Sequence, residues 1–205
     1  MYNNTIMKKF NNIFYISIFI GIIIIISINI YFYYVYPNYI MKKQVIAIAN
    51  IIHDKIKGTV EFYENINNNK VIVHVLLSGL KKNSIHGFHI HEAGDLSDNC
   101  MGACAHFNPY NKNHGGRDSK ERHVGDLGNL KTDNNGNVDL QFSDNLIKLR
   151  GTESNIIGRS IVIHEDEDDE GKGSYPDSLT TGHSGKRIVC AVIGYSKKMF
   201  KKIKE

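Results

Sequence analysis

The chain has 205 residues, enough for one domain of ordinary size with additional segments at its ends. Its net charge of +4 lies in those ends: residues 1–43 and residues 195–205 each carry +4, and the body between them carries −4. A negatively charged body excludes nucleic-acid binding as its function, because such binding depends on a basic surface. The three cysteines lie in the body, and this odd number leaves one thiol over if a disulfide forms.

The first predicted element is a membrane-spanning helix over residues 13–36, which follows a short N-terminal segment, residues 1–12. The sequence IFYISIFIGIIIIISINIYFYYVY has no charged residue, and about 20 such residues cross the hydrocarbon core of a bilayer. Its aromatic end, YFYYVY, is typical of the membrane–water interface. A cleaved signal peptide is the alternative, but its apolar region has only about 7–15 residues and precedes a small-residue cleavage site. We therefore expect an uncleaved single-pass anchor.

The charges around this helix give little information about its orientation. Lysines flank it on both sides, at residues 8–9 and 42–43, so the excess of positive charge that marks the cytosolic side is missing. The free amino terminus tips the prediction towards a body on the non-cytosolic side, and a cytosol-facing body stays open. Residues 37–43 form the predicted linker. Residues 197–205 form a basic tail, which we interpret as a solvated terminus rather than a contact with anionic lipid.

The body begins at residue 44 and alternates apolar and polar residues in short segments, which is typical of half-buried strands. The segments with this pattern are 44–51, 58–64, 70–80, 84–92, 156–165 and 186–196. Residues 128–144 contribute two further strands around an Asn-Gly pair, which is a strong hairpin signal. Helical periodicity is missing, so the pattern predicts an all-β antiparallel sandwich or barrel.

Two long segments without periodicity interrupt these strands, at about 94–125 and 165–186. Loops of this length inside a compact domain are usually functional or disordered. Both contain histidines, glycines and acidic residues, so we expect functional side chains in them.

The stretch GFHIHEAGD, residues 87–95, contains two histidines two positions apart. Alternate residues of a strand point to opposite faces, so His89 and His91 share one face while Phe88 and Ile90 share the other. This spacing predicts an apolar face in the core and a pair of imidazoles opposite. A single histidine is more often structural, whereas two on one strand face favour a metal site.

Further candidate metal ligands lie in the first long loop and at the end of a late strand. They are His106, His114, His123, Asp126 and His164. Imidazole suits copper and zinc, and a carboxylate completes a tetrahedral zinc site. With the histidine pair, the set is too large for one four-coordinate ion and suits two ions with a shared ligand. The remaining body histidines, interpreted as structural or surface residues, are His53, His74, His86 and His183.

The segments GFHIHEAGD, HFNPYNKNHGG, ERHVGDLGN, GRSIVIHE, DDEGKG and GKRIVCAVIG, taken together and in this order, closely resemble the Cu/Zn superoxide dismutase family. The resemblance covers residues 43–196 and leaves out the anchor and the tail. It implies a dismutase domain over residues 44–196, folded as an eight-stranded antiparallel Greek-key barrel or immunoglobulin-like sandwich with two long functional loops.

The resemblance implies one copper and one zinc ion per subunit. The copper ligands would be His89, His91, His106 and His164. The zinc ligands would be His106, His114, His123 and Asp126. His106 would therefore bridge the two ions. Asp168 resembles the aspartate of the family that accepts hydrogen bonds from one histidine of each site, here His89 and His114.

The resemblance also implies roles for residues that are not metal ligands. Arg187 would hold the superoxide anion beside copper, and Thr181 would narrow the channel opposite. His106 would also take up and return a proton. Cys100 and Cys190 match the intrasubunit disulfide of the family, which leaves Cys104 free at a position where the family usually has a small residue without a thiol.

The expected function is therefore the dismutation of superoxide to dioxygen and hydrogen peroxide, as an antioxidant defence. The segments NIIGRS and AVIGYS resemble the dimer-forming segments of the family and imply a homodimer. A copper chaperone is a further expected partner.

Two alternative functions stay open. A non-catalytic copper-binding or copper-delivery module would be expected to carry a separate metal-transfer domain with a C-x-x-C motif, whereas the close pair here, Cys100 and Cys104, is C-x-x-x-C. A structural or surface protein could retain the fold without activity.

Overall fold

The computed structural model describes residues 2–35, 44–65 and 68–200. They fall into two compact units, Met1–Gln44 and Val45–Glu205. The predicted linker, residues 37–43, and the last five residues of the predicted tail lie outside the described residues.

The first unit is one helix, α1 (Tyr2–Ile30), continued by a short turn of wider helix, η1 (Tyr31–Val35). Within it, the span Phe14–Val35 is apolar, and none of it is buried within the structure. At a rise of 1.5 Å per residue, 22 helical residues reach about 33 Å, which matches the ~30 Å hydrocarbon core of a bilayer. Length and composition therefore fit a membrane-spanning helix, and a signal sequence would pass the same test.

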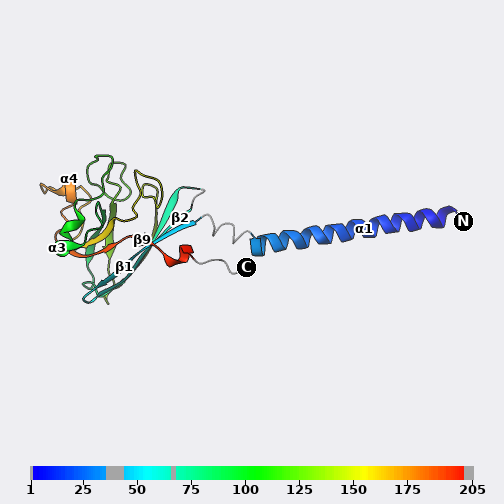
Figure 1. Cartoon of the computed structure of the whole chain (residues 1–205), viewed down its shortest axis with the longest axis horizontal. Coiled ribbons are helices and arrows are strands. Elements are labelled where there is room, and N and C mark those ends of the chain that lie inside the picture. The colour runs from blue at the N-terminus through cyan, green and yellow to red at the C-terminus, as the bar shows by residue number, and fades with distance from the viewer. Residues whose placement is uncertain (1, 36–43, 66–67, 201–205) are drawn as a thin grey trace. The chain divides into compact units, whose positions relative to one another are not determined.

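The second unit is an antiparallel β-sandwich of two sheets, which confirms the predicted fold class (Figure 1). One sheet has the strand order β6-β3-β2-β1-β9, and the other has the order β5-β4-β7-β8. The strands are β1 (Gln44–His53), β2 (Ile56–Asn65), β3 (Lys70–Ser78), β4 (Ile85–His91), β5 (Asp126–Lys131), β6 (Val138–Asp144), β7 (Ser160–His164), β8 (Arg187–Val192) and β9 (Gly194–Tyr195).

The core lies between the two sheets and is built by alternate residues of each strand. In β3, the side chains of Val71, Val73, Val75 and Leu77 are buried, while the residues between them are more exposed. Phe62 of β2 and Phe88 of β4 are fully buried in the same core. Each such side chain contributes about 1.5–3 kcal/mol when it leaves water, so this core can support the site-bearing loops.

The described residues form nine strands where the sequence predicts eight, because the last predicted strand is divided. Its first part, β8, pairs with β7, and its second part, β9, pairs with β1 of the other sheet. Between them, Ile193 is fully buried and exchanges backbone hydrogen bonds with Gly158 and Arg159. The chain therefore passes from one sheet to the other within a single apolar segment.

The Asn-Gly signal marks a turn, but the predicted hairpin is wrong in its pairing. The strands on either side, β5 and β6, belong to different sheets. Thr132 Oγ1 donates to the carbonyl of Lys81, and the amide of Leu80 donates to the carbonyl of Gly136. These bonds tie the turn to the connection between β3 and β4, so both connections cross between the sheets side by side, as in a Greek key.

Two long loops leave the strands, residues 92–125 between β4 and β5 and residues 165–186 between β7 and β8. They contain only single helical turns, α3 (Ser97–Cys100), η2 (Met101–Ala103) and α4 (Ser178–Thr181), and a last turn, η3 (Lys197–Phe200), follows β9. The long loops cover the outer face of the sheet that contains β4, so this strand is buried on both faces.

Candidate metal centre

Strand β4 places two histidines on the face that the long loops cover. Phe88 and Ile90 are fully buried in the core, as the alternation predicts. His89 and His91 lie on the opposite face and are also buried, at 0% and 1% exposure. Buried imidazoles need polar partners, so the contacts of these rings indicate what the site holds.

A first cluster forms where two further histidines approach this pair. His106, in the first loop, forms an isolated β-bridge with His91, and His164 is the last residue of β7, the strand beside β4. All four rings are buried, and one nitrogen of each ring lies within 4.8 Å of the others. This first cluster consists of His89, His91, His106 and His164.

The hydrogen bonds of the first cluster fix which nitrogens carry lone pairs. The Nδ1 of His91 lies 2.9 Å from the carbonyl of Cys104, and the Nδ1 of His164 lies 3.2 Å from that of Gly185. A carbonyl only accepts, so each Nδ1 carries the proton and each Nε2 carries a lone pair. These two Nε2 atoms face each other at 3.4 Å. Two lone pairs at this distance repel each other, so the arrangement fits a cation between them.

The other two rings of the first cluster also present unpaired nitrogens. His89 donates from Nε2 to Oδ2 of Asp168 at 2.8 Å, and its Nδ1 has no hydrogen-bond partner in the part of the chain that the structure describes. The Nε2 of His106 likewise has none, although it is buried. An unsatisfied buried polar atom costs roughly 1–3 kcal/mol, which coordination to a metal would offset.

A second cluster gathers three histidines around one carboxylate oxygen. The Nδ1 atoms of His106, His114 and His123 lie 3.0, 3.0 and 3.1 Å from Oδ1 of Asp126. Ligands at the usual bond lengths from a tetrahedral zinc ion are about 3.3 Å apart, so these spacings suit a small tetrahedral cation. His106 belongs to both clusters because its Nδ1 faces Asp126 and its Nε2 is left for the first cluster.

Asp168 links the two clusters without joining either. Its Oδ2 accepts from His89 and its Oδ1 accepts from Nε2 of His114, each at 2.8 Å. The carboxylate is buried, and the amide of Asn129 donates to the backbone carbonyl of Asp168. One rigid carboxylate thus fixes the tautomer and the orientation of one ring in each cluster.

Burial controls the charge of the first cluster. It lowers the pKa of His89, His91 and His106 below the usual value, and repulsion between the rings adds to this effect. It also lowers the pKa of His164, to about 4. At neutral pH these imidazoles are uncharged, which is the form that binds a metal.

The second cluster behaves differently because it contains a carboxylate. Burial by itself would lower the pKa of His114, but the nearby carboxylates of Asp126 and Asp168 outweigh this and raise the pKa to about 9. Burial would raise the pKa of Asp126, yet the three histidines hold it well below its usual value. Asp126 therefore keeps its negative charge, which would partly neutralise the positive charge of a metal ion bound in this cluster.

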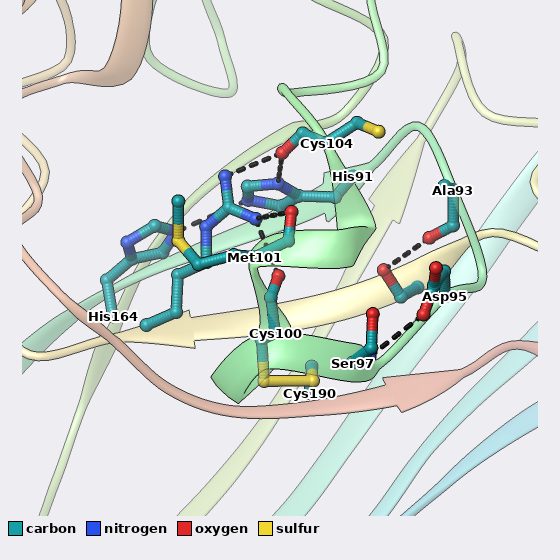
Figure 2. The surroundings of a disulfide bond; sticks show 11 residues. His91, Ala93, Asp95, Ser97, Cys100, Met101, Cys104, His164 and Cys190 are labelled. Atoms are coloured by element: carbon teal, nitrogen blue, oxygen red, sulfur yellow. Dashed lines mark hydrogen bonds between the residues drawn. A yellow bond between two sulfur atoms is a disulfide. The ribbon is translucent and has the colours of Figure 1, made fainter.

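The disulfide lies beside His91 and His164 of the first cluster (Figure 2), and Arg187 shares the carbonyl of Cys104 with His91. Cys100 and Cys190 are bonded, with their Cα atoms 5.9 Å apart, and Cys104 is a free, exposed thiol. Arg187 donates from Nη1 to the carbonyl of Cys100 and from Nη2 to that of Cys104, both at 2.6 Å. The carbonyl of Cys104 also accepts from His91, so one carbonyl holds both the guanidinium and a cluster histidine.

The disulfide fixes this arrangement, because it joins the loop that supplies the carbonyls to β8, the strand that begins with Arg187. The pairing implied by the sequence resemblance is therefore present. The bond spans 90 residues, and closing a loop of this length stabilises a protein by roughly 4–5 kcal/mol in a chain-entropy model.

Thr181, the remaining candidate, lies at the end of α4 and is exposed. Its Oγ1 donates to a carboxylate oxygen of Asp177 at 3.0 Å and lies 3.2 Å from the carbonyl of the same residue. Its role beside the clusters stays a prediction.

Sequence reasoning missed two residues that support the clusters. His86, interpreted as ordinary, is buried, and its Nδ1 donates to the carbonyl of His164 at 2.8 Å, which holds the backbone of a cluster member. At Gly87, a Cβ would lie 2.7 Å from the Cβ of Ser184 and 3.2 Å from the ring of His89. The sequence HGFHIH could have indicated both residues. His86 and Gly87 stand in the same strand as His89 and His91, so they lie close to the same buried site.

Comparisons of the sequence and the structure with known proteins point to one family. The model of a family described as copper/zinc superoxide dismutase matches residues 56–193. A Cu-Zn superoxide dismutase of Paramecium bursaria Chlorella virus 1 is 58% identical over 158 residues, which cover 77% of this chain and 82% of that protein. An extracellular Cu-Zn superoxide dismutase of Drosophila melanogaster is 49% identical over 154 residues, 72% of this chain and 84% of that protein. A crystal structure described as the clock protein EA4 superposes with a TM-score of 0.71 at 42% identity, covering 75% of this chain and 96% of that one.

Proposed function

The chain belongs to the copper/zinc superoxide dismutase family, and from this premise we propose that its two clusters hold one copper and one zinc ion and that Arg187 binds superoxide. It is an oxidoreductase of that family, whose reaction converts two superoxide anions and two protons to dioxygen and hydrogen peroxide. One observation carries the assignment of ligands: buried imidazole nitrogens converge in two groups that share His106, the first made of four imidazoles and the second completed by the carboxylate of Asp126.

The first cluster, with four imidazoles, fits copper, and the second cluster, with three imidazoles and a carboxylate, fits zinc. Copper, when bound, supplies the one-electron chemistry that dismutation needs, and zinc supplies a fixed charge without redox chemistry. The protein orients the ligands, keeps the imidazoles of the first cluster uncharged and covers both clusters with the two loops.

Arg187 is the residue that would bind the anion. Its guanidinium is held by two carbonyls at 2.6 Å, so little conformational freedom is lost when an anion binds. The carbonyl of Cys104 links it to His91, which sets the distance between the anion and the first cluster. Thr181 would border the approach on the side of the second loop.

His106 would handle one of the two protons. Its Nδ1 is held by Asp126 at 3.0 Å, while its Nε2 has no hydrogen-bond partner among the described residues. A proton taken up at Nε2 leaves the ring fixed through Nδ1. The residue can therefore return the proton to the reduced substrate without moving.

Metal analysis of histidine variants tests the ligand assignment. His164→Ala should lose copper and keep zinc, whereas His123→Ala should lose zinc, because each contributes to one cluster only. His74→Ala, outside both clusters, is the control. Equal loss of both metals from His164→Ala and His123→Ala in a folded protein would contradict the division of ligands.

The alternative of a non-catalytic copper-binding or copper-delivery module is not favoured. Among the described residues, every group that could hold a metal draws on the two clusters and Asp168. Of the close cysteine pair, Cys100 is engaged in the disulfide, so a two-thiol transfer site is not formed there.

A homodimer is part of the proposal. The predicted dimer-forming segments, NIIGRS and AVIGYS, lie side by side, since Gly158 and Arg159 exchange backbone hydrogen bonds with Ile193. Within AVIGYS, the side chains of Val192 and Tyr195 are 40% and 48% exposed. Light scattering of the purified chain should give twice its mass of 23.2 kDa, after correction for bound detergent. The mass of a monomer would contradict the proposed homodimer.

A copper chaperone is the proposed source of the copper ion.

The proposed organisation is a segment 1–12, an anchor 13–36, a linker 37–43, a dismutase domain 44–196 and a basic tail 197–205. The supporting observation is the apolar helix Phe14–Val35. The domain would lie on the non-cytosolic side of the membrane, because the free amino terminus adds positive charge to the opposite side of the helix.

A further inference from the structure

The second loop contains a group of three side chains that the proposed function does not use: Tyr175, Asp177 and His183. Asp177 precedes α4 directly, where a carboxylate usually caps the helical turn, but its carboxylate makes no capping bond. Instead, Oδ1 lies 2.8 Å from Nδ1 of His183, and Oδ2 accepts from Oγ1 of Thr181 at 3.0 Å. One carboxylate therefore orients the threonine and the histidine together.

The backbone at His183 is held in an unusual conformation. Its φ is +48°, directly after Gly182 with φ of +66°. Left-handed residues other than glycine are uncommon, although histidine is among those that adopt this conformation more often. The conformation turns the imidazole back onto the ring of Tyr175, with centroids 3.6 Å apart and planes 7° from parallel. Stacking and the bond to Asp177 offset the backbone strain.

These side chains enclose the segment that packs on the metal centre. The backbone amide of His114 donates to the carbonyl of Leu179, and the amide of Asp169 donates to that of Gly182. The Oγ of Ser184, which is buried, donates to the carbonyl of Thr181 at 3.0 Å. A restraint between Asp177 and His183 therefore fixes the backbone on both sides of Thr181.

We propose that Asp177, His183 and Tyr175 are positioning residues for the approach of superoxide: they fix Thr181 and turn the Asp177 carboxylate towards two donors and away from the anion. This inference rests on the proposed function, in which Thr181 borders that approach. The Asp177 side chain is 45% exposed, so a carboxylate freed from its donors would repel an anionic substrate.

The main variant is His183→Asn in the full chain, solubilised in detergent and loaded with copper and zinc. Asparagine also accepts a left-handed backbone but has no ring to stack on Tyr175. The matched control is His74→Asn, which removes a histidine 3.2 Å from Asp139 on the other sheet. The double variant Asp177→Asn/His183→Asn removes the released charge as well. Tyr175→Leu removes the stacking alone.

Two measurements distinguish the effect on the order of the second loop from the effect on the electrostatic attraction of superoxide. Hydrogen exchange of the amides of residues 178–184 should be about tenfold faster in His183→Asn than in His74→Asn, and faster also in Tyr175→Leu. The rate constant with superoxide should fall about threefold at low ionic strength and recover as salt screens charges beyond ~8 Å. The double variant should regain the low-salt rate while its exchange stays fast.

If the amides of residues 178–184 exchanged at the same rate in His183→Asn and in the His74→Asn control, the inference would be overturned, whatever the activity of the two variants. Faster exchange with an unchanged rate constant, in a chain whose unmodified form is active, would overturn the role in substrate approach. An unmodified chain that binds both metals but does not consume superoxide would instead refute the proposed function, and the exchange data would still decide whether the restraint exists.

Discussion

Cys104 has a backbone conformation that few side chains adopt, with φ of 64° and ψ of −150°. This region is essentially restricted to glycine, and another residue there costs about 1–3 kcal/mol. Replacement by glycine also lowers stability by about 0.5–1 kcal/mol through chain entropy. Relief of strain is the larger effect, so we expect Cys104→Gly to raise the free energy of unfolding by about 1 kcal/mol. Urea unfolding of residues 44–205 measures it.

The control for Cys104→Gly is Cys104→Ser, which removes the thiol and keeps the side chain. It should leave the strain in place and give no increase in stability. If serine stabilised as much as glycine, the thiol rather than the backbone would be responsible. Arg187 should remain bound in both variants, since its partner is the carbonyl of residue 104.

His164 predicts a pH dependence of the metal-free protein. Burial lowers its pKa in the folded protein to about 4, against about 6.5 in an unfolded chain. Between these values the unfolded chain binds a proton that the folded protein does not, so stability falls as pH falls from 6.5 to 4. We expect this histidine to contribute about 2–3 kcal/mol to that loss.

Urea unfolding of metal-free residues 44–205 at several pH values between 7 and 4 tests this. His164→Asn should have a shallower loss of stability over this window, although His89, His91 and His106 still contribute in the same direction. Equal slopes for the variant and the parent would show that His164 is not buried in its neutral form.

Single residues also show how far sequence reasoning reaches. The alternation in GFHIHEAGD is enough to predict that Phe88 and Ile90 are buried opposite His89 and His91, because strand geometry has a period of two. The supporting role of His86 could not be predicted in this way. Its spacing assigns it to the core face, and its bond to the carbonyl of His164 depends on a strand far along the sequence.

At the level of elements, close packing of the second loop on the metal centre depends on Gly182. Its φ is +66°, and a Cβ there would lie 2.0 Å from Oδ1 of Asp168 and 2.5 Å from Nε2 of His114. Gly182→Ala should therefore displace Asp168 and reduce the zinc content of the purified protein. The strained backbone alone would cost about 1–2 kcal/mol.

Gly151→Ala separates these two effects. Gly151 also has a positive φ, +81°, but a Cβ there has nothing within 4 Å. We expect a similar backbone cost and an unchanged zinc content, measured by elemental analysis. Equal zinc content in the two alanine variants would mean that the loop tolerates the added methyl group at Gly182.

The elements were largely predictable, and their pairing was not. Each predicted strand exists because hydrophobic alternation is local information. The Asn-Gly pair was correctly read as a turn, but the strands that it joins separate into two sheets because Thr132 and Gly136 bond to the neighbouring connection. The division of the last strand at Ile193 could not be predicted for the same reason. Both halves have the same apolar pattern, and they differ only in the strand with which each one pairs.

At the level of the whole molecule, the apolar helix should keep the full chain on membranes. Phe14–Val35 has the length and composition to cross a bilayer. We expect the full chain to stay with membranes after extraction with high salt or alkaline carbonate, while residues 44–205 stay in solution. Residues 45–205 form a compact unit with its own hydrophobic core, which supports such a fragment.

N-terminal sequencing of the mature protein completes this test. An anchored protein should retain the residues before position 36. A mature chain that begins near residue 40 would contradict the anchor and show that the apolar helix is a cleaved signal sequence.

The rate of superoxide loss, measured directly by its absorbance after pulse generation, tests the central claim for the whole molecule. The full chain with one copper and one zinc should remove superoxide at a rate proportional to protein concentration, with many turnovers per chain. Its metal-free form should have no such effect. A protein that binds both ions in the two clusters, with Arg187 intact, and removes superoxide no faster than its metal-free form would contradict the account.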